Sequence, residues 1–288
     1  MPINPRRLLD WPFPGRECAV SQRDAMLYAL SLGLGADPVH AGQLRFVHEL
    51  DGGPEVLPSM AFATGWPGLW FMESATGIDS SGVVNGGQHV TLHRPIPLET
   101  PIAAHCRITG VSDKGPGRGA LVHLSRDLVN AATRAPIATV KSTLFCRKDG
   151  GCGSAGKEPA QPVAVPDRAP DMTLDMATST QAALLYRLNG DLHALHSDPA
   201  TAQAAGFDRP ILHGLATLGV AGHALLAGLC DYHPGRLASM GARFTAPVYP
   251  GDTISLEIWR DAQAVRFRGH VRSRQARVLD DGSATLHH

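Results

Sequence analysis

The sequence predicts an α+β protein in which one unit of helices and antiparallel strands occurs twice. Similar strings recur in the same order on either side of a segment rich in Gly, Pro and Ala, which indicates an internal duplication. Each half combines apolar residues at helical spacing with strand-like alternation, as is typical of an α+β unit. The chain has 288 residues, of which 43% are hydrophobic, and this is enough for one large domain or two medium ones.

The segment rich in Gly, Pro and Ala separates the two halves. Residues 148–170 have the sequence KDGGCGSAGKEPAQPVAVPDRAP and show no periodic apolar pattern, so we interpret them as a linker. We therefore expect an N-terminal repeat at residues 1–147 and a C-terminal repeat at residues 171–288.

Two pairs of strings carry the duplication. DAMLYALSLG, which starts at Asp24, matches QAALLYRLNG, which starts at Gln181, and both are apolar at helical spacing. VTLHRPIPLETPIAAH and ARFTAPVYPGDTISLE each predict a strand that is interrupted by a proline, Pro95 or Pro247, and followed by a second strand.

The end of each half predicts a hairpin, with turns expected near Pro136 and Gly282. Between the first helix and the strands, the two halves differ. In the second half Pro210 suits a first helical turn, and residues 211–229 are apolar nearly all the way round, which predicts a buried helix. In the first half Pro67 interrupts the matching string, which therefore cannot form one regular helix.

Charge and cysteine usage exclude several classes of protein. The 26 basic and 26 acidic residues leave no bulk charge to attract nucleic acid or an anionic membrane. The N-terminus lacks the apolar run of a signal peptide, and no window approaches a membrane-spanning length. The five cysteines are scattered, with no CxxC pair, which predicts a reducing compartment. We expect a cytoplasmic protein with no nucleic-acid or membrane partner.

The chemically interesting residues gather in residues 186–214, YRLNGDLHALHSDPATAQAAGFDRPILHG. Asp191 and His196 lie outside the predicted helices, and a carboxylate with an imidazole is the combination that general acid–base chemistry on water requires. The alternative is a turn residue and an ordinary surface histidine. Metal binding by His193, His196 and His213 is less favoured, because no HxH or HExxH spacing is present.

Two further residues of this stretch have structural alternatives. Asp198 precedes Pro199 and predicts a helix cap. Gly214 lies near the start of the buried helix, where unpaired N–H groups can polarise a carbonyl oxygen and stabilise negative charge on it. Alternatively, Gly214 serves only close packing of the helix on a sheet.

The string GDxxxLHxDPxxAxxAGFxxPILHGL resembles the signature of the MaoC-like, (R)-specific type 2 enoyl-CoA hydratases, which have the hot dog fold. LYALSLGLGADP, VLPSM and VTLHRPIP resemble the degenerate N-terminal repeat of the double hot dog members, and ARFTAPVYPGDTISLEIW resembles their C-terminal part. The resemblance covers residues 22–286. It implies two tandem hot dog repeats, each an antiparallel sheet wrapped around a central helix, with the N-terminal repeat degenerate.

The resemblance also implies an activity. Such enzymes add water reversibly and in syn fashion to a trans-2-enoyl-CoA and give a (3R)-3-hydroxyacyl-CoA, in fatty-acid or side-chain oxidation. By the same resemblance, Asp191 and His196 activate the water and return a proton to the α carbon, and the N–H of Gly214 binds the thioester oxygen. The substrate is then an acyl-CoA, no cofactor or metal is needed, and the protein is a monomer or a homodimer.

The chain departs from the family pattern in two places. His193 and Ala194 stand where most members have Asn-Pro, so either a ring nitrogen of His193 orders the loop or the loop is arranged differently. VVNGGQ, with Asn85 and Gly87, stands where relatives have a histidine and an acidic residue, so we expect no catalysis in the first half. His213 is expected to order the turn before the buried helix.

Candidate substrate contacts follow from position. Arg209 and Arg243 are candidates for the CoA phosphates, although either can be a solvated surface charge. Trp66 and Trp70 lie in the broken segment of the first half and are candidates for the lining of an apolar acyl tunnel, with plain core packing as the alternative.

Three competing functions remain on the same fold. They are a dehydratase of a specialised hydroxyacyl-CoA, a thioesterase, and a catalytically silent subunit that binds acyl-CoA. Asp191 and His196 argue against the thioesterase, and an inert subunit has no chemical need for both residues.

Overall fold

The computed structural model describes residues 2–49, 52–159 and 164–287. Residues 160–163 of the predicted linker lie outside the described residues, and so do Met1 and His288 at the outer ends of the two predicted repeats.

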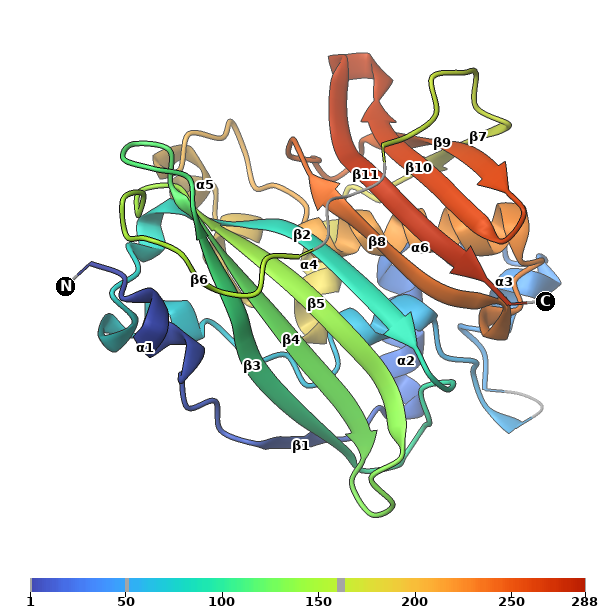
Figure 1. The fold of residues 1–288 in the computed structure, drawn as a ribbon. Coiled ribbons are helices and arrows are strands. Elements are labelled where there is room, and N and C mark those ends of the chain that lie inside the picture. Colours follow the sequence, from blue (N-terminus) through green and yellow to red (C-terminus); the bar gives the residue numbers. More distant parts are fainter. Residues whose placement is uncertain (1, 50–51, 160–163, 288) are drawn as a thin grey trace.

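The strands form one continuous sheet (Figure 1) in the order β1-β3-β4-β5-β2-β8-β11-β10-β9-β7, with β6 paired to β3. The order is symmetric about the β2–β8 pair, because each strand of the first half has a counterpart at the same distance in the second. The antiparallel β2–β8 pairing places Gly87 opposite Arg243 and Thr91 opposite Ser239. The duplication in the sequence is therefore a duplication of the sheet.

The helices and strands have the following bounds. The first half contains α1 (Pro5–Leu9), β1 (Arg16–Cys18), α2 (Gln22–Ser31), α3 (Ala41–Leu44), β2 (Val83–Leu92), β3 (Ile102–Asp113), β4 (Ala120–Asn130) and β5 (Pro136–Cys146), followed by β6 (Ala155–Gly156). The second half contains β7 (Met172–Ala177), α4 (Ala182–Tyr186), α5 (Pro199–Ala204), α6 (Gly214–Leu229), β8 (Leu237–Phe244), β9 (Thr253–Asp261), β10 (Ala264–Val271) and β11 (Ala276–Leu286).

Helix α6 forms the centre of the core, behind the sheet in Figure 1. Every residue from Ala216 to Leu226 is buried, as the apolar string predicts. Glycines let its neighbours approach closely: the α-carbon of Gly219 faces Leu32, and that of Gly222 faces Met240 of β8. The helix is thus enclosed by elements of both halves.

In the described residues of the first half, no regular helix matches α6. The central segment of this half forms short 3-10 turns at Pro58–Phe62, Trp70–Met72 and Ser74–Thr76, and the chain bends at Gly65 and Gly68 on either side of Pro67. The buried guanidinium of Arg126 donates to the carbonyl oxygens of Ala61 and Phe62, at 2.9 and 2.8 Å. A buried charged donor therefore holds the end of the 3-10 turn that replaces the helix.

Two boundaries differ from the sequence prediction. Helix α6 begins at Gly214 and not at Pro210, because the amide of Leu212 donates to the carbonyl of Val248 (2.7 Å) and keeps this segment extended. The second hairpin turns at 272–275, whereas Gly282 lies inside β11 at a break in its register with β8.

The first hairpin turns just before Pro136, as predicted, and β5 begins at this residue. In the predicted linker, Ala155 and Gly156 add a short strand to β3. Among the described residues, no helix is both long and apolar enough to cross a membrane.

Gly282 is required where β11 passes Phe267, because a Cβ at this position would clash with the carbonyl oxygen and the ring of Phe267. We expect Gly282→Ala to lower the free energy of unfolding by about 2 kcal/mol, the usual cost of an overpacked site. Gly235→Ala is the matched control, since its Cβ meets no atom within 4 Å. Urea unfolding measures both, and equal midpoints would contradict the prediction.

Candidate active site

The loop that carries Asp191 is anchored at the end of α4. Gly190 adopts a left-handed conformation (φ 111°), which ends the helical turn and directs the chain outward. The side-chain amide of Asn189 donates to the Tyr186 carbonyl (3.0 Å) and to the Ser31 hydroxyl of α2 (3.3 Å). The backbone just before Asp191 is therefore held in place by contacts to both halves.

His193 orders the next turn through a ring nitrogen, one of the two arrangements that its replacement of Asn requires. Its Nδ1 accepts from the amide of Leu195 (3.2 Å) and caps the 3-10 turn at Ala194–His196. Its own amide donates to Oδ1 of Asp191 (3.2 Å), which orients the carboxylate.

His196 is held in one tautomer. Its Nδ1 lies 2.9 Å from the carbonyl oxygen of Ile211, and because a carbonyl only accepts, Nδ1 carries the proton. Nε2 therefore presents a lone pair. Burial lowers the pKa of His196, and the charge of His193 acts in the same direction, while the Ile211 bond and Asp191 oppose the shift. The ring is accordingly a neutral base at pH 7.

The structure brings Asp191, His196 and His213 together, with one ligand-type atom of each within 4.8 Å of the others. The rings of His196 and His213 are stacked, with centroids 3.7 Å apart and an interplanar angle of 24°. Lone pairs lie in the ring planes, so two stacked rings direct them side by side and not toward one ion at about 2.0–2.1 Å. The cluster suits proton transfer better than joint coordination of a metal.

Gly214 is the first residue of α6, and the N-terminus of this helix has no side-chain cap. By contrast, Ser21 caps α2, and Asp198 caps α5 as predicted. The first-turn N–H groups of α6 are therefore available to an anion or a polarised oxygen. A Cβ on Gly214 would lie 3.4 Å from the Phe244 ring, an ordinary contact, so close packing does not by itself demand glycine.

A pair of arginines flanks Tyr249 beside this segment. The guanidinium of Arg209 lies 5.1 Å from the centroid of the Tyr249 ring, and that of Arg274 lies 5.0 Å from it. Arg274 also pairs with Asp252 at 2.8 Å, whereas Arg209 has no ion pair in the described part of the chain. The sequence prediction missed Arg274 and Tyr249; the available signal was the string PVYPGD, where the first-half echo has Pro97 in place of Tyr249.

Arg243 lies on the other face of β8 from Gly214. Side chains alternate between the two faces of a strand, and its neighbour Phe244 faces Gly214, so Arg243 projects from the opposite face. There it pairs with Asp281 (2.7 Å) and Asp280 (3.3 Å), which neutralise its charge. The structure favours the alternative of a surface charge for Arg243, and its contact with the CoA phosphates stays a prediction.

The structure gives Trp70 the alternative role of core packing. Its ring is 6% exposed and lies 5.2 Å from the ring of Phe13 and 6.0 Å from that of Trp11. Trp66 is half-buried, and its carbonyl accepts from Arg16, so a lining role for Trp66 stays a prediction.

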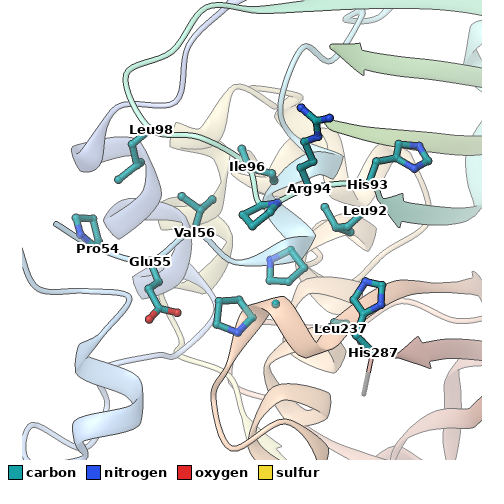
Figure 2. A pocket seen from close by; sticks show the side chains of 14 residues that line it. Pro54, Glu55, Val56, Leu92, His93, Arg94, Ile96, Leu98, Leu237 and His287 are labelled. Carbon is teal, nitrogen blue, oxygen red and sulfur yellow. The ribbon is translucent and has the colours of Figure 1, made fainter. Parts of the chain in front are cut away.

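A cavity of about 590 Å³ lies where β2 ends and β8 begins (Figure 2). This is the end of the β2–β8 pair that is remote from Gly214. Pro58, which starts the 3-10 turn of the first half, lines it with Leu92 at the end of β2. In the second half, His213 immediately precedes α6, and Phe244 ends β8. By the match of the two halves, Pro58 stands where the second half has His213, so the cavity corresponds to the corner formed by Asp191, His196, His213 and Gly214, which we call the candidate catalytic corner.

Comparison with known proteins agrees with this architecture. Residues 19–148 match the family model of the MFE-2 hydratase 2 N-terminal domain, and residues 161–280 match that of the MaoC like domain. A solved MaoC-like dehydratase from Phytophthora capsici matches with a TM-score of 0.85 and 28% identity over 98% of both chains. A Mycobacterium tuberculosis protein described as a double hot dog matches with a TM-score of 0.59 and 19% identity, over 95% of this chain and 93% of that one. The protein thus has the expected double hot dog fold.

Two relatives place it within that class. The chain is 40% identical to 3-hydroxyacyl-thioester dehydratase Y of Mycobacterium tuberculosis over 91% of both proteins. It is 33% identical to the probable enoyl-CoA hydratase 2 of Dictyostelium discoideum, over 99% of this chain and 97% of that one. The chain belongs to the family of MaoC-like dehydratases and enoyl-CoA hydratases 2.

The backbone bonds fix opposite tautomers for the two stacked histidines. We expect nitrogen-15 NMR to show the Nδ1–H form of His196 and the Nε2–H form of His213. Since burial lowers the pKa of His213 to about 3, its ring should remain neutral at pH 5. A protonated His213 at pH 5, or matching tautomers, would contradict this geometry.

Proposed function

We propose that this protein catalyses the reversible syn hydration of a trans-2-enoyl-CoA to a (3R)-3-hydroxyacyl-CoA, in fatty-acid or side-chain oxidation. The observation that carries the proposal is a neutral His196 with a free Nε2, beside the carboxylate of Asp191 and next to the uncapped start of α6. This set supplies a base, an orienting carboxylate and an oxyanion site, as addition of water to an α,β-unsaturated thioester requires.

The proposed reaction starts with water held between Asp191 and His196. One water proton passes to this pair as the oxygen forms its bond to C3 of the substrate. The π electrons of the C2–C3 double bond move toward the thioester oxygen, where the N–H of Gly214 stabilises the negative charge. The same proton then returns to C2. Because a single acid–base pair delivers both parts of the water to one face, the addition is syn.

Asp191 has its two oxygens in different surroundings. Oδ1 accepts from the His193 amide, so this bond fixes the plane of the carboxylate and leaves acceptor positions for the water. His193 therefore supports the reaction through the loop and takes no proton in it.

The substrate phosphates are assigned to the end of the site that carries Arg209 and Tyr249. Arg209 is exposed and free of carboxylate partners among the residues described, so its charge is available to a phosphate. Tyr249 lies close to both guanidinium groups and offers an aromatic face. The acyl chain is assigned to the broken segment of the first half, near Trp66.

The remaining parts of the proposal follow from the same observations. The proposed chemistry needs no cofactor or metal. All five cysteines are free, which supports the cytoplasm as the location, although a relative from Arabidopsis thaliana is named a peroxisomal enoyl-CoA hydratase 2. We propose a monomer or a homodimer, because one chain already contains both repeats.

Removal of either acid–base group is expected to slow hydration strongly. Asp191→Asn and His196→Gln should each lower kcat by about 10²–10⁴-fold, the usual contribution of general acid–base catalysis. The assay follows the loss of enoyl absorbance of crotonyl-CoA and longer trans-2-enoyl-CoA esters, with chiral analysis of the product. Asp198→Asn is the matched control, because asparagine caps a helix as well as aspartate does.

The assay can refute the proposal in two ways. A (3S) product from the unmodified protein would exclude the proposed face of addition. Undiminished activity in both the Asp191 and the His196 variants would exclude the acid–base pair itself.

The phosphate assignment predicts that two exposed arginines respond differently. Arg209→Ala should raise KM for crotonyl-CoA about 5- to 10-fold with little change in kcat, because a contact made equally in the ground and transition states is lost. Arg243→Ala should leave both constants within about twofold, since the side chain projects from the other face of the sheet. Equal effects of the two variants, or an unchanged KM in Arg209→Ala, would overturn the assignment.

A further inference from the structure

We propose that His213 is a positioning residue that holds both members of the acid–base pair at once. Its ring stacks on His196, and its Nε2–H binds the backbone of Asp191 (3.1 Å). This inference rests on the proposed function, because it assigns His213 a task in that reaction. It goes beyond the ordering of a turn, since it links the orientation of the base to that of the carboxylate.

The contacts of His213 leave its ring no freedom. The residue is 1% exposed, its centroid is 3.7 Å from that of His196, and the ring of Tyr186 lies 4.9 Å away. Because the carbonyl of Asp191 can only accept, Nε2 carries the proton, and Nδ1 is left buried as a lone pair with no partner among the described residues. An unpartnered buried atom has an energetic cost, so simple packing would be better served by an apolar ring.

The stacked ring also controls the surroundings of the base. His196 is faced by Asp191, His193 and His213, and Arg187 acts on His213 from the end of α4. A neutral His213 covers one face of His196 without adding charge when His196 takes up a proton. It thereby excludes water from that face and contributes to the burial that keeps His196 deprotonated.

The internal duplication provides a comparison within the same chain. The first-half position that corresponds to His213 is occupied by Pro58, at the start of the 3-10 turn that faces β2. That half also lacks counterparts of Asp191 and His196: the segment after α2 is GLGADP, from Gly33 to Pro38. The histidine is therefore present only in the half that carries the acid–base pair.

Helix α6 supplies a matched control for the loss of a buried histidine. His223 is 4% exposed, and its ring nitrogens contact the Leu32 carbonyl and the Tyr232 hydroxyl, both at 3.3 Å. Like His213, it is a deeply buried histidine, and it lies in the helix that His213 precedes, but within the described part of the chain it has no hydrogen bond or ring contact with Asp191 or His196. Variants of His223 therefore show how the loss of a buried histidine with a merely structural role affects stability and kcat.

Two substitutions separate the two contacts of His213. His213→Gln retains a donor near the Asp191 carbonyl and removes the ring, whereas His213→Phe retains a ring against His196 and removes the donor. Each should lower kcat about 10- to 100-fold with KM changed less, because misplaced catalytic groups act on kcat. His223→Gln and His223→Phe should lose stability while kcat of the folded protein stays within about threefold.

The pH dependence of kcat/KM distinguishes a positioning role from a merely structural one, because loss of a structural residue does not shift it. In His213→Gln water reaches the ring of His196, so its pKa rises toward the ordinary value of histidine. Since the reaction needs neutral His196, the acid limb of kcat/KM should shift to higher pH, by about half a unit or more. His213→Phe and both His223 variants should leave the limb in place.

NMR titration of His196 in the same variants separates the positioning role from the reaction. A raised His196 pKa in His213→Gln, in a protein that hydrates no enoyl-CoA, would sustain the positioning role and overturn the proposed function. An unmoved pKa and acid limb, or kcat within threefold in both His213 variants, would overturn the positioning role. If His213→Gln fails to fold, His213→Asn, which has a shorter amide, is measured in its place under the same criteria.

Discussion

The structure depends on the burial of one helix that is apolar on every side. A helix with this pattern cannot lie on the surface of a single sheet, because half of it would face water. Here Met240 of β8 and Ser59 of the first half approach α6 at Gly222, and Leu32 of the first half approaches it at Gly219. The continuous sheet, joined by β2 and β8, lets one helix be shared by both repeats. The duplicated sheet and the single central helix therefore depend on each other, because only the joined sheet and the first half together bury the helix on every side.

The position of the candidate catalytic corner follows from this helix. Its N-terminus is fixed at Gly214 by the extended segment before it, which is held on Val248, and no side chain satisfies its first N–H groups. The extended segment also supplies the carbonyl of Ile211 that sets the tautomer of His196. One short stretch of backbone thus connects the proposed oxyanion end of the helix to the proposed base. The chemistry requires both at a fixed distance, and the buried helix provides the rigidity.

The sequence predicted what depends on local pattern and missed what depends on pairing between distant segments. The duplication, the buried helix, the broken segment at Pro67 and the cap at Asp198 all follow from short-range spacing, and each is present. The start of α6 was misplaced because the amide of Leu212 bonds to Val248, a partner 36 residues away. The face of Arg243 required the strand register, and the turn assigned to Gly282 is a bulge set by its neighbours across the sheet.

The two halves also show what a duplicated fold needs in order to support chemistry. Both retain the strand that ends in a proline-containing turn and a cavity or corner beside it, so the scaffold alone does not create a site. What distinguishes the second half is a set of backbone acceptors, the carbonyls of Ile211 and Asp191, each bound to a ring nitrogen. In the first half, Pro58 cannot make such a bond, and the helix that would supply an oxyanion site is replaced by 3-10 turns. The first half thus has neither the regular helix nor the histidine ring donors. The two losses are connected, because the proposed reaction requires both an oxyanion site and an acid–base pair.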